Sequence, residues 1–199
     1  MSPGPTFERV YLELKRQLRA GTRAPGAPLE PGAIGDELGT SFTPVRDALH
    51  RLVGEGLVEN PQHNGFAVPR PTEQALRDLY SWNGQIALLA LRAPMQALAA
   101  GSLSTDVAPA ARSETIFAAV AATAGNLEHV KAVTQLNDRL APYRGAEPRV
   151  FRDLDEELSG MEAALMRGAA GAARAALTRY HRRRIAAVAE ILQALANTG

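Results

Sequence analysis

The spacing of apolar residues between positions 29 and 68 predicts two short helices, a tight turn between them and a β-ribbon after them. The first apolar stripe begins at Leu29 and is interrupted at 39–41 by the sequence Gly-Thr-Ser. The second stripe repeats at the i, i+3, i+4 and i+7 positions of an amphipathic helix, on Val45, Ala48, Leu49 and Leu52. Two short apolar runs, 57–58 and 66–68, flank a polar segment that contains Gly65 and predict a hairpin. This order of elements is that of a winged helix-turn-helix, a module that binds DNA.

The rest of the chain predicts helices. Apolar residues recur at helical spacing from Phe7 to Leu18, which adds an amphipathic helix before the module. Beyond Pro71 the chain is rich in alanine and leucine, and the apolar pattern predicts helices over about 73–100, 112–124, 126–143, 150–167 and 170–197. Pro94 is expected to kink the first of these, and a loop is expected over 101–109. The predicted fold is mainly α, with an N-terminal winged helix-turn-helix that carries a small β-wing over 1–70 and a C-terminal all-α helical bundle over 71–199.

Composition narrows the class of protein. The 22 Lys and Arg residues nearly balance the 21 Asp and Glu residues, so the formal net charge of +1 does not by itself indicate a nucleic-acid partner. The chain has no cysteine, which excludes disulfides, thiolate zinc sites and cysteine nucleophiles. Because it has no leader and no apolar run long enough to span a membrane, we expect a soluble, cytoplasmic protein without a membrane partner. No catalytic triad spacing, metal-binding box or glycine-rich phosphate loop is present, so we expect neither an enzyme nor a bound cofactor.

The predicted module carries a specific, ordered motif. It reads TPVRDAL at 43–49, then EGLV at 55–58, then GF at 65–66 before Val68. Over residues 7–70 this sequence resembles the GntR family of bacterial transcription regulators. The helical remainder is similar, more weakly, to the FadR-type branch of that family, whose C-terminal bundle binds effectors.

The chain keeps only part of the family's DNA-contacting set. In the family, arginines of the second helix and of the recognition segment typically contact DNA. At the matching positions this chain retains Arg46, while Gly32 and Phe42 stand at the other two. Asn64 replaces the basic residue that is usual at the tip of the wing. The resemblance therefore does not carry the family's operator sequence over to this chain.

The candidate DNA-binding residues follow from the motif and the predicted wing. They are Thr43, Pro44, Arg46, Arg51, His63, Asn64 and Gly65. Arginine is the key member because its planar guanidinium can donate two hydrogen bonds to one guanine base. Structural alternatives stay open: Thr43 can cap the recognition helix, Arg46 can bond a helix end, and His63 can be merely solvated.

The resemblance also implies a divalent metal bound in the bundle by an aspartate and three histidines. The matching positions are Glu114, Ala118, Leu158 and His181. Alanine and leucine offer no lone pair, so we expect no metal at this site. Glu114 and His181 then either form a carboxylate–imidazole hydrogen bond, or His181 is an ordinary helix histidine with satisfied ring nitrogens.

The effector pocket is expected to differ from the family pattern as well. The arginine that often anchors a carboxylate ligand in the first bundle helix is Asn83 here, and its glutamate partner is Ala87. The candidates for lining a largely apolar pocket are Tyr80, Trp82, Asn83, Glu114, Tyr143, Tyr180 and His181. Each of them could equally belong to an ordinary core. The basic cluster at 179–184 is expected to be a solvated face or a dimer contact.

Together these patterns predict a dimeric, ligand-responsive transcriptional regulator that acts as a repressor. Its expected partners are a double-stranded DNA operator with a short inverted repeat, a small-molecule effector of unknown identity and a second copy of the chain. The alternative is a repurposed family member that binds or transforms a small molecule without specific DNA binding. The sequence leaves open whether the bundle binds an effector or only dimerises.

Overall fold

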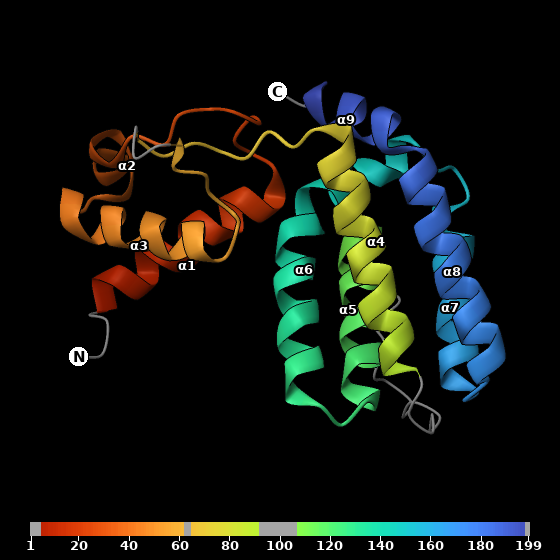
Figure 1. Ribbon diagram of the computed structural model, residues 1–199. Helices are drawn as coiled ribbons and strands as arrows, with labels where there is room; N and C mark the ends of the chain where they lie inside the picture. Colours follow the sequence, from red (N-terminus) through yellow and green to blue (C-terminus); the bar gives the residue numbers. More distant parts are fainter. Residues whose placement is uncertain (1–4, 62–64, 92–106, 198–199) are drawn as a thin grey trace. The chain divides into compact units, whose positions relative to one another are not determined.

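The computed structural model describes residues 5–61, 65–91 and 107–197, and it divides into two compact units between Arg70 and Pro71 (Figure 1). The described residues are mainly helical, as predicted. No helix among them is long and apolar enough to cross a membrane.

The first unit is a three-helix cluster. It consists of α1 (Pro5–Ala20), α2 (Pro31–Leu38) and α3 (Phe42–Gly54), with α1 packed along α3 (Figure 1). The predicted apolar stripes form one core, in which Leu14, Leu49 and Leu52 are completely buried. The turn between α2 and α3 depends on Gly39, whose φ of 61° is a left-handed conformation that glycine adopts without strain.

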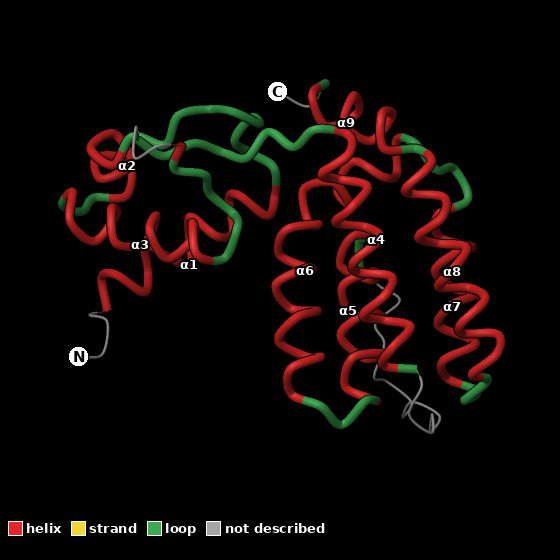
Figure 2. The backbone as a smooth tube through the Cα atoms, viewed as in Figure 1, coloured by secondary structure: helices red, strands yellow, loops and turns green. Residues whose placement is uncertain are grey.

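The segment after α3 pairs through isolated bridges. Ala67 pairs antiparallel with both Pro28 and Glu59, and the Leu29 amide donates to the Phe66 carbonyl at 2.8 Å. The described residues contain no strand (Figure 2), so the predicted β-wing is not confirmed in that form. Prolines 28, 61 and 69 border these segments, and a proline lacks the amide hydrogen that would extend a ladder. The predicted wing tip at 62–64 lies outside the described residues.

A polar cluster ties α1 to the end of α3. The carboxylate of Glu55 accepts hydrogen bonds from the Tyr11 hydroxyl at 2.7 Å and from the Lys15 ammonium at 2.9 Å. The guanidinium of Arg51 stacks over the Tyr11 ring at 3.7 Å and pairs with Glu55 at 3.3 Å. Partial burial opposes ionisation of Glu55, but the bonds from Lys15 and Tyr11 outweigh it, so the pKa of Glu55 is lowered.

The second unit is an all-helical bundle. Its helices are α4 (Glu73–Ala90), α5 (Pro109–Thr123), α6 (Leu127–Ala146), the short 3-10 helix η2 (Glu147–Arg149), α7 (Leu154–Met166), α8 (Ala170–Ala186) and α9 (Val188–Ala196). They enclose one apolar core (Figures 1 and 2). Thr72 and Asn126 cap α4 and α6 with side-chain oxygens, which stabilises both helix starts.

The helix bounds differ from the predicted ranges in several places. The helix predicted over 73–100 is shorter, because α4 ends at Ala90 with Leu91 as its C-cap. The helix predicted over 170–197 is two helices, because the chain turns at Ala187 and aims the apolar side chains of α9 into the core. α5 begins at Pro109, where a missing amide hydrogen is harmless, rather than at 112. In place of a helix from 150, η2 and a turn precede α7. The predicted kink at Pro94 and most of the 101–109 loop lie outside the described residues.

A buried ion-pair network joins α8 to η2 and α7. The guanidinium of Arg184 is completely buried and donates to Glu147 at 2.9 Å and to Glu157. It also stacks over the Tyr180 ring at 3.5 Å, and the Tyr80 hydroxyl donates to Glu147 at 2.8 Å. The expectation that the whole 179–184 cluster is a solvated face or a dimer contact is therefore wrong for Arg184. Its position continues the apolar stripe of α8, so it faces the core.

The Glu55 cluster generates a prediction about stability and pH. Glu55→Gln should lower the free energy of unfolding of the first unit by about 1 kcal/mol at pH 7. The reason is that a neutral amide oxygen replaces the charged carboxylate that accepts hydrogen bonds from Lys15 and Tyr11. The folded-state pKa of Glu55 lies below the ordinary glutamate pKa of 4.5, so this stabilisation is present above pH 4.5 and is lost as the pH falls through the folded-state pKa. Hydrogen exchange of α1 and α3 amides measures both effects. Glu59→Gln, at an exposed position, is the control, and equal losses in the two variants would contradict the prediction.

The Arg184 network generates a second prediction. Arg184→Met should lower the free energy of unfolding of the bundle by about 3–5 kcal/mol, because it removes the buried cation that neutralises Glu147 and pairs with Glu157. Urea unfolding followed by tryptophan fluorescence measures this, since Trp82 in α4 is the single tryptophan. Arg179→Met, at an exposed position of the same helix, should change stability by less than about 0.5 kcal/mol. Similar losses of unfolding free energy in Arg184→Met and Arg179→Met would contradict this prediction.

Candidate functional site

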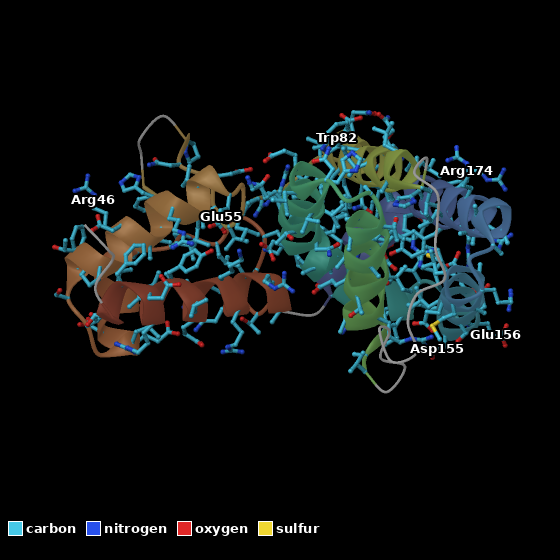
Figure 3. All side chains as sticks on the ribbon, turned by 90° about the horizontal axis from the view of Figure 1, so that it is seen from below. Arg46, Glu55, Trp82, Asp155, Glu156 and Arg174 are labelled. Carbon is cyan, nitrogen blue, oxygen red and sulfur yellow. The ribbon has the colours of Figure 1, made fainter. Side chains whose placement is uncertain are left out.

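One face of α3 presents a row of polar side chains to solvent. Thr43, Arg46, Asp47 and His50 follow helical spacing and are all exposed. Arg46 has no hydrogen bond or ion pair with any described residue, and it projects away from the ribbon (Figure 3). Phe42, at the start of the same helix, is 53% exposed. A face of this kind, on the second helix of a helix-turn-helix, is the one that enters a DNA groove.

Arg46 differs from other cationic side chains of this unit, which bond to neighbouring residues. Lys15 pairs with Glu55, Arg16 with Glu13, and Arg23 with Glu37. Arg9 donates to the carbonyl of Leu38, and Arg70 donates to the carbonyl of Pro25. Because Arg46 bonds to no described residue, its guanidinium can bind a phosphate or a base without first losing an intramolecular bond.

The other predicted DNA-binding residues are distributed differently. Arg51 lies about 140° around α3 from Arg46, since the two residues are five positions apart in the helix. It stacks on Tyr11 and pairs with Glu55, so the structure does not bring Arg51 together with Arg46. Thr43 and Pro44 lie in the first turn of α3, and Ser41 holds the N-cap position without a capping side-chain bond. Gly65 is exposed with a φ of 90°, whereas His63 and Asn64 lie outside the described residues.

A second polar site lies inside the bundle, where α4, α6 and α8 meet. The completely buried guanidinium of Arg144 donates to the Asn137 side-chain oxygen at 2.7 Å and to the Asn83 side-chain oxygen at 3.3 Å. It also lies over the Phe117 ring of α5 at 4.8 Å. The same oxygen of Asn83 lies 2.9 Å from Nε2 of His181. Side chains from four helices therefore converge on one buried point.

His181 is held as a neutral side chain. Its Nδ1 lies 2.8 Å from the carbonyl oxygen of Leu177, one turn earlier in α8. Burial, followed by the charges of Arg144 and Arg184, lowers the pKa of His181 to about 3. Because the carbonyl of Leu177 can only accept, Nδ1 carries the proton and Nε2 is an acceptor. The two ring nitrogens lie against Leu177 and Asn83 rather than against the Glu114 carboxylate.

Two buried nitrogen atoms around this point have no hydrogen-bond partner among the described residues. They are Nε of Arg144 and Nδ2 of Asn83. Within the described part of the chain, Arg144 forms no ion pair with a carboxylate, although the other two buried arginines do. Arg184 pairs with Glu147, and Arg112 pairs with Glu162 at 2.7 Å. Buried polar groups are rarely left unsatisfied, so this point is chemically incomplete.

The structure gathers some of the predicted pocket residues and separates others. Asn83, Tyr180 and His181 meet at the buried point. Tyr80 belongs to the neighbouring Glu147 network, Tyr143 is buried in the core, and Glu114 is half-buried on α5. Trp82 is 48% exposed on the outer side of α4 (Figure 3), so its predicted place in the pocket is corrected: positions 80 and 83 face inward, and 82 does not.

Sequence reasoning missed Arg144 and Asn137. The signal lay in the helical spacing, because Val133, Leu136 and Leu140 form an apolar stripe that continues at Arg144. Among the described residues there is no group of three or more side chains of the types that commonly hold a metal ion. Ala118 and Leu158 stand at two of the positions where the resemblance implies ligands. The chemistry of the buried point is therefore that of a guanidinium surrounded by amides and aromatic rings.

Comparisons with known proteins match the first unit most clearly. Residues 6–68 match the family model described as bacterial regulatory proteins, gntR family. The chain is 29% identical over 150 residues to the HTH-type transcriptional regulator McbR of Escherichia coli, which is 75% of this chain and 65% of that protein. It is 36% identical over 83 residues to the HTH-type transcriptional repressor NagR of Bacillus subtilis, which is 41% of this chain and 34% of that protein. The matched stretches thus span less than two thirds of these relatives.

Solved structures match over nearly the whole chain. The structure of E. coli McbR/YncC superposes with a TM-score of 0.71 at 21% identity and covers 94% of this chain and 99% of that one. A candidate GntR regulator from Rhodococcus sp. RHA1 superposes with a TM-score of 0.73 at 17% identity, covering 92% and 97% of the two chains. At these identities the likeness shows the fold alone. The first unit therefore matches the gntR family of bacterial regulatory proteins over residues 6–68, and the chain shares its fold with solved regulators.

Proposed function

We propose that this protein is a dimeric, ligand-responsive transcriptional regulator that represses by binding a short inverted repeat. Residues 1–70 form the DNA-binding domain, and 71–199 form the domain that dimerises and binds the effector. The observation that carries the proposal is Arg46, an exposed guanidinium on the outer face of α3 without an intramolecular partner among the described residues. The names of the relatives support it, since NagR is a transcriptional repressor and McbR a transcriptional regulator.

Arg46 supplies the chemistry that base recognition needs. Its two parallel N–H groups match the O6 and N7 acceptors of a guanine in the major groove, and such a contact discriminates bases by about 1–3 kcal/mol. Thr43, one turn earlier on the same face, can donate to a phosphate. Phe42 can contact a thymine methyl group but cannot replace a second arginine. We therefore expect an operator whose sequence differs from those of relatives that carry arginine at the positions of Gly32 and Phe42.

Dimerisation follows from the size of the reading surface. One recognition helix reads only a few base pairs, whereas two helices related by a two-fold axis read an inverted repeat about one helical turn apart. An effector that favours one spacing of the two DNA-binding domains changes affinity for the operator. By thermodynamic linkage, the operator changes affinity for the effector by the same factor.

The proposal predicts the effect of removing one side chain. Arg46→Ala should weaken binding to the operator by about 1–3 kcal/mol, a loss of roughly tenfold or more, and relax specificity at one base pair in each half-site. Fluorescence anisotropy of the protein on labelled DNA from its own upstream region measures this across a salt series. Arg46→Lys should restore the salt dependence but not the specificity, because an ammonium lacks the guanidinium fork.

Arg16→Ala is the matched control, because Arg16 is an exposed arginine of the same unit that pairs with Glu13. It should leave specific binding unchanged. Binding that disappears with added salt and is the same in the wild type and in Arg46→Ala would indicate phosphate attraction alone. That result would overturn the proposal in favour of a repurposed family member without specific DNA binding.

A further inference from the structure

We infer that Phe42 determines specificity by contacting the C5-methyl group of a thymine, close to the guanine that Arg46 contacts. The inference rests on the proposed function, because it assigns a base to the same face of α3. The exposure of Phe42, its place in the helix and the chemistry of base edges support this assignment.

Phe42 leaves a large apolar side chain in water. It is 53% exposed and belongs to neither of the two apolar cores that the described residues form. The other phenylalanines are buried or packed against a core, namely Phe7, Phe66, Phe117 and Phe151. Covering the Phe42 ring in a complex is therefore favourable. A single exposed apolar residue is common on protein surfaces, so its position decides what could cover it.

The position of Phe42 is within the proposed interface. It is the first residue of α3, and the amino-terminal residues of a recognition helix are the ones that contact base edges. Phe42 and Arg46 are four residues apart in α3. Side chains at this spacing are neighbours on one face of a helix, with about 5–6 Å between their Cβ atoms. The groove that receives Arg46 therefore also receives Phe42.

Among the unmodified bases, thymine is the one that offers Phe42 an apolar partner. In the major groove the edges of guanine, adenine and cytosine present hydrogen-bond donors and acceptors, whereas thymine presents a methyl group beside its carbonyl oxygen. A phenyl ring neither donates nor accepts, so over another base it would displace water from polar atoms without replacing the lost hydrogen bonds. The ring favours thymine by contact and disfavours the other bases by desolvation.

The spacing of the two side chains limits where this thymine can lie. Four residues rise about 6 Å along an α-helix, and successive base pairs are about 3.4 Å apart. We therefore expect the thymine within about two base pairs of the guanine that Arg46 contacts. The two-fold symmetry of a dimer gives one such thymine in each half-site.

The test removes the methyl group alone. The full wild-type chain first selects its tightest duplex from a library with a randomised segment. Each thymine of that duplex is then replaced in turn by deoxyuridine, in both half-sites, and fluorescence anisotropy measures the Kd. At one position uracil should raise the Kd about fourfold for each half-site, or roughly 15-fold for both. That position should lie within about two base pairs of the one where Arg46→Ala relaxes specificity.

A methylated cytosine separates the methyl contact from other properties of thymine. At the sensitive position, a duplex with 5-methylcytosine should bind about fourfold more tightly for each half-site than the same duplex with cytosine. Equal affinities for these two duplexes would show that the methyl group is not what the protein contacts, and would overturn the inference.

Three variants assign the effect to one side chain. Phe42→Ala should bind the thymine and uracil duplexes with equal Kd, and this ratio does not depend on how much of the variant is folded. Leu12→Ala should keep the preference for thymine. It is the matched control, because Leu12 is a 55% exposed apolar residue of the same unit, on α1. Phe42→Arg should select guanine at that position, because a guanidinium matches its O6 and N7 atoms.

The outcomes separate this inference from the proposed function. Specific binding without a methyl-sensitive thymine, or with a sensitivity that persists in Phe42→Ala, would overturn the role of Phe42 and leave the regulator supported. A sensitive thymine far from the position of Arg46 would also overturn it. If the protein selects no duplex over competitor DNA, the proposed function fails, and the role of Phe42 fails with it.

Discussion

A charge removed from water is stabilised by an opposite charge, and the buried ion pairs of Arg184 use this to hold parts of the helical bundle together. Arg184 has no exposed surface, yet it joins α8 to η2 through Glu147 and to α7 through Glu157. These contacts fix how three separate segments of the chain lie against one another, because a shift of any of them would leave a buried ion unpaired. The apolar core provides most of the driving force for folding, but apolar contacts are tolerant of sliding. The ion pairs of Arg184 do not tolerate such sliding, because a displacement separates the charges.

The same chemistry divides the arginines of the first unit into internal and external ones. Arg51 stacks on Tyr11 and pairs with Glu55, so it stabilises the packing of α1 on α3. Arg46, five residues earlier, lies on another face of the helix and keeps its donors free of the described residues. One side of α3 packs on α1 through Arg51, and this leaves the side of Arg46 for the proposed contact with DNA. A helix that is held rigidly on one face can present a guanidinium on another face in a fixed position.

Helical periodicity sufficed to predict the order of elements, because apolar stripes report directly on which face of a helix is buried. The turn at Gly39 agrees with the break predicted at 39–41, and α4 begins at the residue where the apolar pattern predicted a helix start. Other features depended on residues far apart in sequence. Alanine carries no signal for the break at Ala187, and nothing near Arg184 announces that Glu147 lies beside it. An arginine on an apolar stripe is the sign to look for, and both Arg144 and Arg184 carry it.

The two fully buried arginines are held differently. Arg184 has its counter-charges in the chain, so any opening of the bundle there separates ions and is strongly unfavourable. Arg144 donates instead to the neutral amides of Asn137 and Asn83, and it forms no ion pair with a described residue. Moving α4 away from α6 therefore breaks hydrogen bonds to amides without separating an ion pair of Arg144, and hydrogen bonds between protein groups contribute less than buried ion pairs cost to break.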